Sequence, residues 1–261
     1  MRVKLCVLAS GSSGNCTFIS AGGTRILMDA GLSAQQTKQR LAEIGERPED
    51  IDAICISHEH TDHVAGIRVL QNKYGIPVYA NAETRTGIIH SDQKCAALQF
   101  HVFSTGAPFK IGDVQIEPFS VPHDARDPVG FVVSAGERSI GVATDMGVVT
   151  NLIREKLRRC HVAVIEANHD EELLYDSPRP WGLKQRIRGN QGHLSNIAAA
   201  TLVAEIAGDA LQHLFLAHMS VDCNCPHRAR SLFESLLAEA GHTHVTVRLT
   251  CADRVSEQLI L

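Results

Sequence analysis

The segment "ISHEHTDHVAG", residues 56–66, concentrates side chains that bind metal ions. It contains His58, His60, Asp62 and His63. In an extended loop, residues two apart project to the same side, so His58 and His60 can chelate one ion. Asp62 and His63 follow where the chain turns into an expected helix, and they can reach a second ion nearby. Imidazole and carboxylate ligands suit Zn²⁺, Mn²⁺ or iron, so the segment predicts a metal centre.

A polar loop with incidental histidines is the alternative interpretation of this segment. Packing alone gives no reason to crowd four ligand-type side chains at this spacing, so we favour metal binding. Further ligands must come from elsewhere in the chain. Three polar residues stand where an apolar run stops: His123 in "FSVPHDA", Asp145 in "GVATDMG" and His218 in "LFLAHMS". A strand that ends at such a residue would present it to a cleft.

The elements that must position these side chains alternate between apolar runs and helical patterns. We expect strands over residues 3–10, 24–31, 51–57, 114–121, 130–136, 139–145, 162–168, 214–218 and 244–250. We expect helices over residues 33–45, 64–75, 150–160, 194–208 and 227–241. Two strand-rich halves with helices outside them predict an α/β fold, a four-layer αββα sandwich. A doubly wound single sheet is the alternative, and the consecutive strands between about residues 100 and 145 count against it.

Composition narrows the class of protein. The 261 residues, 44% of them hydrophobic, form one expected domain over residues 1–261, without a linker or repeat. The opening run "MRVKLCVLAS" is too short for a membrane span and lacks a signal peptide's cleavage pattern, so we expect a cytoplasmic protein without a membrane partner.

Eight scattered cysteines, several in apolar runs, predict reduced thiols. Cys223 and Cys225 could form a soft metal pair, but we favour ordinary loop cysteines.

The order of the ligand-type residues resembles that of the metallo-β-lactamase fold hydrolases over nearly the whole chain. The shared pattern is HxHxDH followed by single His, Asp and His residues at strand ends. The resemblance implies two divalent ions (Zn, Mn or Fe) that share one bridging carboxylate, Asp145. One ion would be held by His58, His60 and His123, and the other by Asp62, His63 and His218.

Four further segments resemble the YycJ/WalJ (VicX) group, which is similar to the tRNase Z-type phosphodiesterases of the superfamily. They are "LASGSSGNCT", "EANHD", "GHLSN" and "LAHMS". The group is associated with DNA exonuclease activity on 5′ ends. One departure is "VDCNCP" after residue 220, where the group's pattern leads us to expect an acidic, asparagine-rich stretch. True β-lactamases usually carry cysteine where this chain has Asp145.

Two residues are expected to assist the leaving group. His193 in "QGHLSN" stands at the start of an expected helix, whose positive dipole end favours an anion. The resemblance to tRNase Z-like enzymes implies that Glu166 in "VIEAN" is its partner. A histidine that merely neighbours a helix cap is the alternative, and we favour contact with the reacting phosphate. Asp62 is expected to be catalytic as well as a ligand.

The turn "SGSSGN" could meet a phosphate through its backbone amides and hydroxyl groups, with Ser12 and Asn15 facing the cleft. Further along the chain, "WGLKQRIRGNQGH" supplies Lys184, Arg186 and Arg188, cations of the kind that contact a nucleic-acid backbone.

Three other residues belong to the expected site or lie beside it in the sequence. Trp181 could stack on a base, but we favour burial for it. His169 is either a substrate contact or a structural hydrogen-bond partner, and Asn196 is expected to contact substrate.

The resulting functional prediction is a dinuclear metal-dependent phosphodiesterase, a DNA exonuclease that acts from 5′ ends with a metal-bridging hydroxide. DNA is favoured over RNA as the nucleic-acid substrate, and the protein could be a homodimer. The enzymatic alternative is hydrolysis of a small ester, lactone, thioester or cyclic phosphodiester in the same site. A nucleic-acid-binding protein without turnover is a third interpretation, which the complete ligand set disfavours. The net charge of −4 argues against a generic polyanion binder, although it allows a local basic patch.

Overall fold

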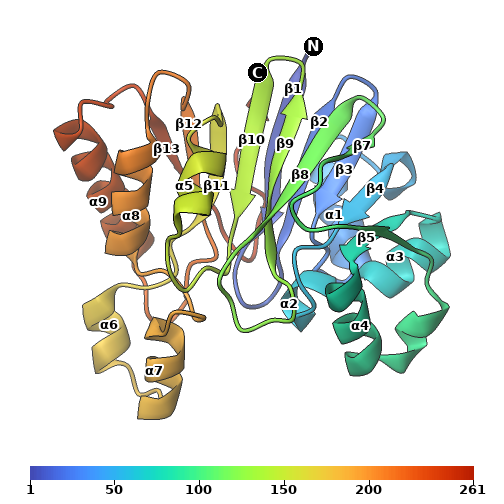
Figure 1. The fold of residues 1–261 in the computed structure, drawn as a ribbon, viewed down its shortest axis with the longest axis horizontal. Helices are drawn as coiled ribbons and strands as arrows, with labels where there is room; N and C mark the ends of the chain where they lie inside the picture. Colours follow the sequence, from blue (N-terminus) through green and yellow to red (C-terminus); the bar gives the residue numbers. More distant parts are fainter.

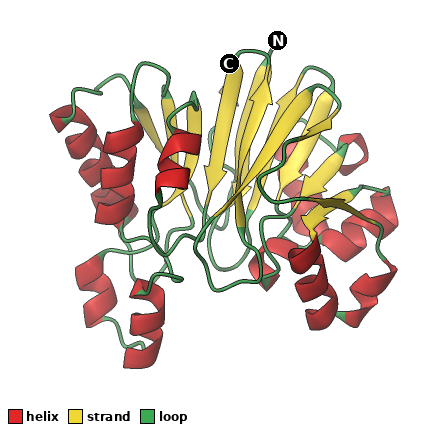
Figure 2. Ribbon diagram, viewed as in Figure 1, coloured by secondary structure: helices red, strands yellow, loops and turns green.

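The computed structural model describes residues 1–261 as two seven-stranded sheets that face each other, with helices outside them (Figures 1 and 2). In the first sheet the order is β14-β1-β2-β3-β4-β5-β6, with β1 (Val3–Ala9), β2 (Cys16–Ala21), β3 (Thr24–Met28), β4 (Ala53–Cys55), β5 (Val78–Asn81), β6 (Phe100–Phe103) and β14 (Leu259–Ile260). In the second it is β13-β12-β11-β10-β9-β8-β7, with β7 (Phe109–Ile111), β8 (Val114–Ser120), β9 (Val129–Ala135), β10 (Arg138–Ala143), β11 (Val162–Glu166), β12 (His213–Ala217) and β13 (Thr246–Leu249).

Helices cover the outer faces of both sheets. The first sheet is covered by α1 (Ala34–Glu43), α3 (Ile67–Tyr74) and α4 (Ala82–Ser91), and the second by α5 (Asn151–Leu157), α8 (Asn196–Ile206) and α9 (Pro226–Glu239). Short helices complete the chain: α2 (Thr61–Val64), α6 (Glu171–Asp176), α7 (Trp181–Arg188) and the 3-10 turns η1 (Pro48–Asp50) and η2 (Gln93–Ala97). Figure 1 shows α6 and α7 beyond the end of the second sheet, at the lower left.

Three apolar layers explain why the chain forms four layers of secondary structure. Along β1, Leu5 and Val7 pack between the two sheets, whereas Cys6 and Leu8 pack against the helices on the outer face. Because successive side chains of a strand point to opposite faces, a strand buried on both sides must be apolar throughout. The predicted αββα sandwich is therefore confirmed, and the alternative of one doubly wound sheet is wrong.

Local signals predicted some elements better than others. Ser33 and Gln36 form the expected capping box at the start of α1, and Gly45 follows its end with a φ of 75°. By contrast, β2 follows a glycine- and serine-rich turn so closely that the sequence gives it no separate signal. Helix α8 begins at Asn196 with Ser195 as its N-cap, so the expected start before residue 195 is wrong.

All eight cysteines are free, which confirms the prediction of reduced thiols. Cys223 is buried and Cys225 is half-buried in the loop that precedes α9. None of the helices combines the length and the apolar character needed to cross a membrane.

The strand directions place the site. In the first sheet β1 runs in the same direction as β3 and β4, because it is antiparallel to β2, which is antiparallel to β3. In the second sheet β8, β10, β11 and β12 likewise share one direction. Loops at the carboxyl ends of these strands carry the ligand-type residues of the sequence, and they meet at one edge of the sandwich.

Candidate metal centre

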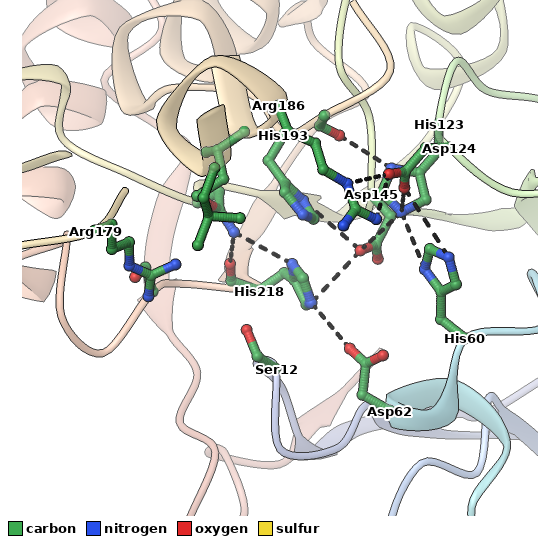
Figure 3. Close-up of a pocket in the computed structure, with 15 residues that line it drawn as sticks. Ser12, His60, Asp62, His123, Asp124, Asp145, Arg179, Arg186, His193 and His218 are labelled. Atoms are coloured by element: carbon green, nitrogen blue, oxygen red, sulfur yellow. Dashed lines mark hydrogen bonds and ion pairs between the residues drawn. The ribbon is translucent and has the colours of Figure 1, made fainter. Parts of the chain in front are cut away.

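A cavity of about 230 Å³ lies where the loops of the two sheets meet (Figure 3). The loops after β4, β8, β10 and β12 bring His60, His123, Asp145 and His218 to its wall. Apart from Leu183 and Ile187, the wall has no large apolar side chain. So polar a cavity suits an ionic ligand better than an apolar one.

The first group of ligand-type atoms consists of three imidazole nitrogens. His58 Nε2 lies 3.1 Å from His60 Nδ1, and His123 Nε2 lies 3.3 Å from the same atom. His123 Nδ1 donates to the carbonyl oxygen of Gly192 at 3.0 Å, which leaves its Nε2 to face the group. The outer hydrogen bond fixes the ring orientation as it does for histidines that bind metals.

The second group consists of Asp62, His63 and His218. Asp62 Oδ2 lies 3.5 Å from His63 Nε2 and 3.4 Å from His218 Nε2. The outer nitrogens are held from behind, since His63 Nδ1 lies 2.9 Å from Asp29 Oδ2 and His218 Nδ1 lies 3.1 Å from Glu166 Oε1. The inner atoms of all three residues therefore converge on one point.

Asp145 lies between the two groups. Its Oδ2 is 3.3 Å from His63 Nε2, and its Oδ1 is 3.5 Å from His218 Nε2 and 3.8 Å from His123 Nε2. The residue is 2% exposed, and its Oδ2 has no hydrogen-bond partner although it is buried. Its φ of 58° is unusual for a residue other than glycine and shows that the fold holds the carboxylate in place.

These features fit divalent cations. Each of the two groups places its ligand atoms within 4.8 Å of one another, and a buried carboxylate oxygen without a donor marks the space between them. A buried carboxylate is stable only when it is paired or bound to a metal. The seven side chains that the sequence singled out therefore lie together.

The carboxylates of this centre raise the pKa values of two of its histidines. Burial lowers the pKa of His218, but the Asp145 charge and the hydrogen bonds to Asp62 and Glu166 outweigh burial and raise it to about 10. Burial opposes the charge on His63 too, and the negative charges of Asp29 and Asp145 raise its pKa well above the ordinary value. The surrounding carboxylates therefore favour the doubly protonated, charged form of both rings, and a metal ion would compete with one of those protons.

Metal binding is therefore expected to release roughly one to two protons per chain at pH 7, because only the neutral imidazole is a ligand. Affinity should fall as the pH is lowered, since His63 and His218 are then held protonated, and rise as the pH approaches their raised pKa values. Calorimetric titration with Zn²⁺ in two buffers of different ionisation enthalpy measures the release. A binding enthalpy that is the same in both buffers would contradict this charge assignment.

His193 and Glu166 lie beside the centre as a hydrogen-bonded pair. His193 Nδ1 lies 2.7 Å from Glu166 Oε1, and the His193 ring is on the cavity wall (Figure 3). Glu166 is fully buried and accepts backbone hydrogen bonds from Met146 and Leu194 through its Oε2. Burial lowers the pKa of His193, but the charge and hydrogen bond of Glu166 outweigh it and raise this pKa above its ordinary value.

The charge and hydrogen bond of the buried Glu166 favour the protonated form of the His193 ring. His193 lies before the N-cap Ser195 of α8, so the sequence-based argument from the helix dipole is wrong in its detail. Burial also raises the pKa of Glu166, and the His193 charge together with its hydrogen bonds lowers it to about 2. The pair therefore places an imidazole with a raised pKa at the cavity wall.

Gly31 allows the "SGSSGN" turn to lie close to the HxHxDH segment. A Cβ at Gly31 would lie 1.6 Å from the carbonyl oxygen of Asp62, which accepts a hydrogen bond from the Asn15 amide at 2.7 Å. We expect Gly31→Ala to displace Asp62, to cost about 1–3 kcal/mol of stability and to weaken metal binding. Gly182→Ala is the matched control, because no atom lies within 4 Å of its Cβ. Thermal unfolding and metal titration of both variants measure the effect, and equal values for the two would contradict it.

The residues predicted to bind substrate fall into two sets. Ser12 and Arg186 line the cavity. Lys184 and Arg188 lie on an adjacent hollow of α7. Asn15 is buried behind the centre, where its amide nitrogen lies 3.2 Å from Asp62 Oδ2.

His169 and Asn196 are buried away from the cavity wall. The His169 ring is 3.4 Å from Asn168 Oδ1, and burial lowers its pKa to about 4. Asn196 exchanges side-chain hydrogen bonds with Asn224. These contacts favour a structural role for His169 over a contact with substrate. Asn196 does not line the cavity either.

The sequence interpretation missed three residues of the centre. Asp29 orients His63 and accepts hydrogen bonds from the backbone and hydroxyl of Ser57. The signal was present, because Asp29 ends the apolar run "RILMD" as Asp145 ends "GVATD". Asp124 and Arg179 also line the cavity, and no local pattern marked them.

The family model of the beta-lactamase superfamily domain matches residues 24–219. The chain belongs to the beta-lactamase superfamily. It is 35% identical to the exodeoxyribonuclease YycJ of Bacillus anthracis, over 92% of this chain and 91% of that protein. It is 38% identical to the exodeoxyribonuclease WalJ of Streptococcus pneumoniae, over 91% of this chain and 89% of that protein.

Superfamily membership is also visible in the fold. The metallo-beta-lactamase fold protein YhfI from Bacillus subtilis covers 100% of both chains with a TM-score of 0.75 at 16% identity. The predicted resemblance to this superfamily and to its YycJ/WalJ group is thus confirmed. The chain is a metal-dependent hydrolase of the beta-lactamase superfamily, and its His/Asp cluster indicates divalent metal ions.

Proposed function

We propose that this chain is a dinuclear metal-dependent exodeoxyribonuclease that degrades DNA from 5′ ends. The observation that carries the proposal is the placement of Asp145 between two three-residue groups, with His193 beside them. The names of the relatives in Bacillus anthracis and Streptococcus pneumoniae support DNA as the substrate.

His58, His60 and His123 would hold one cation, and Asp62, His63 and His218 the other, with Asp145 shared between them. Nitrogen and carboxylate ligands accept zinc, manganese or iron. Two such cations would lower the pKa of a water molecule and neutralise charge on the phosphoryl oxygens.

The protein's own side chains complete the reaction. Asp62 is 22% exposed in the cavity, whereas Asp145 is 3% exposed, so Asp62 is the carboxylate placed to accept a proton from the attacking water. His193 donates its proton to the oxygen that leaves phosphorus, and Glu166 keeps the ring oriented and charged.

Phosphate binding is assigned to Arg186 and Ser12. Both line the cavity, Arg186 beside Asp124 and Ser12 near Asp62 (Figure 3). A guanidinium group suits the non-bridging oxygens of a phosphodiester because it can donate two parallel hydrogen bonds. A cytoplasmic location and a homodimer stay predictions.

The test is degradation of linear duplex DNA labelled at its 5′ or its 3′ end by the metal-loaded protein. Early release of labelled mononucleotide from the 5′ end supports the proposal, and His60→Ala should abolish that release. The control is His90→Ala, because His90 is exposed on α4. Turnover of a lactone or thioester without DNA degradation would favour the small-ester alternative and overturn the nuclease.

A further inference from the structure

The arm formed by α6 and α7, residues 171–188, projects from the sandwich (Figure 1). A small apolar cluster of Leu174, Ile187 and Cys223 attaches it to the rest of the protein. Arg179, between the two helices, pairs with Asp222 at 3.1 Å. The arm contributes little to the main core, so packing against the core does not account for its exposed side chains.

Helix α7 presents two neighbouring faces. Leu183, Arg186 and Ile187 line the metal cavity. A second hollow, beside it on the helix, is lined by Trp181, Lys184, Gln185 and Arg188. Residues at positions i, i+3, i+4 and i+7 lie on one face of a helix, so these four side chains form a continuous strip. The strip leads away from the site on the same helix that completes the cavity.

Two large aromatic rings are exposed on this arm. Trp181 is 55% and Tyr175 64% exposed, and their rings meet edge to face with centroids 6.5 Å apart. The interpretation of Trp181 as a buried side chain is therefore wrong. Lys184 Nζ donates to the Tyr175 carbonyl oxygen at 2.5 Å and lies 5.9 Å from the ring centroid, which holds the arm's aromatic and cationic groups together.

Charge on the strip is unbalanced. Arg179 and Arg186 pair with Asp222 and Asp124, whereas Lys184 and Arg188 have no carboxylate partner. Two free cations beside an exposed indole stand out in a chain of net charge −4. Cations that track phosphates and aromatic rings that stack on bases are the combination by which proteins bind single-stranded nucleic acid.

We propose that this strip of α7 binds a single-stranded segment of the DNA that continues from the metal cavity. Trp181 stacks on a base, and Lys184 and Arg188 contact the phosphates on either side. The inference rests on the proposed nuclease function, because it extends the path of that substrate. A duplex end would have to open before its strand could reach the strip.

Fluorescence gives a direct test, because Trp181 is the only tryptophan in the chain. Metal-free protein, kept inactive with a chelator, is titrated with a 5′-phosphorylated thymidine oligomer of about 12 nucleotides. Saturable quenching of the Trp181 emission is expected. An oligomer of equal length and charge with abasic sites should bind, as followed by anisotropy of a label on the DNA, without this quenching. Binding of the thymidine oligomer without quenching, or equal quenching by the abasic oligomer, would overturn the proposal.

Variants measure how much the stacking contributes. Trp181→Ala should weaken binding of the thymidine oligomer roughly 5- to 150-fold, whereas Trp181→Phe should retain most of it. Leu152→Ala, which shortens another exposed apolar side chain, is the matched control. Hydrolysis of bis-p-nitrophenyl phosphate by the unaltered, metal-loaded protein tests the proposed function separately. If the protein hydrolyses this diester and Trp181→Ala binds DNA normally, the DNA-binding role of the strip is refuted and the proposed function stands. If the protein hydrolyses no phosphodiester, the proposed nuclease function itself is refuted.

Discussion

Asp145→Asn is expected to reduce DNA hydrolysis by about 10³-fold or more, because the amide keeps the shape of the side chain and removes its charge. Asp145 is the residue within reach of both groups, since its oxygens lie 3.3 Å from His63 Nε2 and 3.8 Å from His123 Nε2. Two adjacent cations repel each other unless an anion is shared between them. We therefore also expect the bound metal to fall from two ions per chain toward one.

Metal content by mass spectrometry and kcat on linear DNA are the measurements for Asp145→Asn. The control is Asp209→Asn, which removes one negative charge from an exposed turn. Circular dichroism should show both variants folded. An Asp145→Asn protein that retains two ions and normal turnover would show that the shared carboxylate is not needed, and the dinuclear proposal would have to be abandoned.

His193→Ala is expected to slow DNA hydrolysis by about 10²- to 10⁴-fold, the range that a positioned general acid contributes. Glu166 is buried and its Oε1 lies 2.7 Å from His193 Nδ1, so it raises the pKa of the ring and favours the form that can donate a proton. Its side chain is 21% exposed and lies on the cavity wall, so it can reach a leaving oxygen. The DNA 3′ oxygen is a poor leaving group, and its departure benefits from a proton.

The leaving group distinguishes proton donation from a structural role. A p-nitrophenolate ion leaves without a proton, so His193→Ala should impair hydrolysis of a p-nitrophenyl phosphodiester far less than hydrolysis of DNA. Glu166→Gln should show the same selectivity, because it removes the charge that keeps His193 protonated. Equal losses on both substrates would instead indicate that the centre as a whole is disturbed.

Much of the candidate centre could be predicted from the sequence, because its residues are marked by local pattern. His123, Asp145 and His218 each end an apolar run, and the strands β8, β10 and β12 do end before them. His58 and His60 lie on the loop after β4, and Asp62 and His63 lie on α2, which follows at once, so spacing alone brings the four together. The two strand-rich halves likewise pointed to two sheets with helices outside them.

Tertiary structure alone decided which side chains meet the cavity. His169 and Asn196 were expected to contact substrate and are buried, whereas Trp181 was expected in the core and is exposed. Arg179 reaches the cavity from a loop that carries no motif. Periodicity along the chain shows where a strand or helix ends, and hence where a ligand can stand. Exposure and contact depend on how elements distant in sequence pack together, and local pattern does not contain that information.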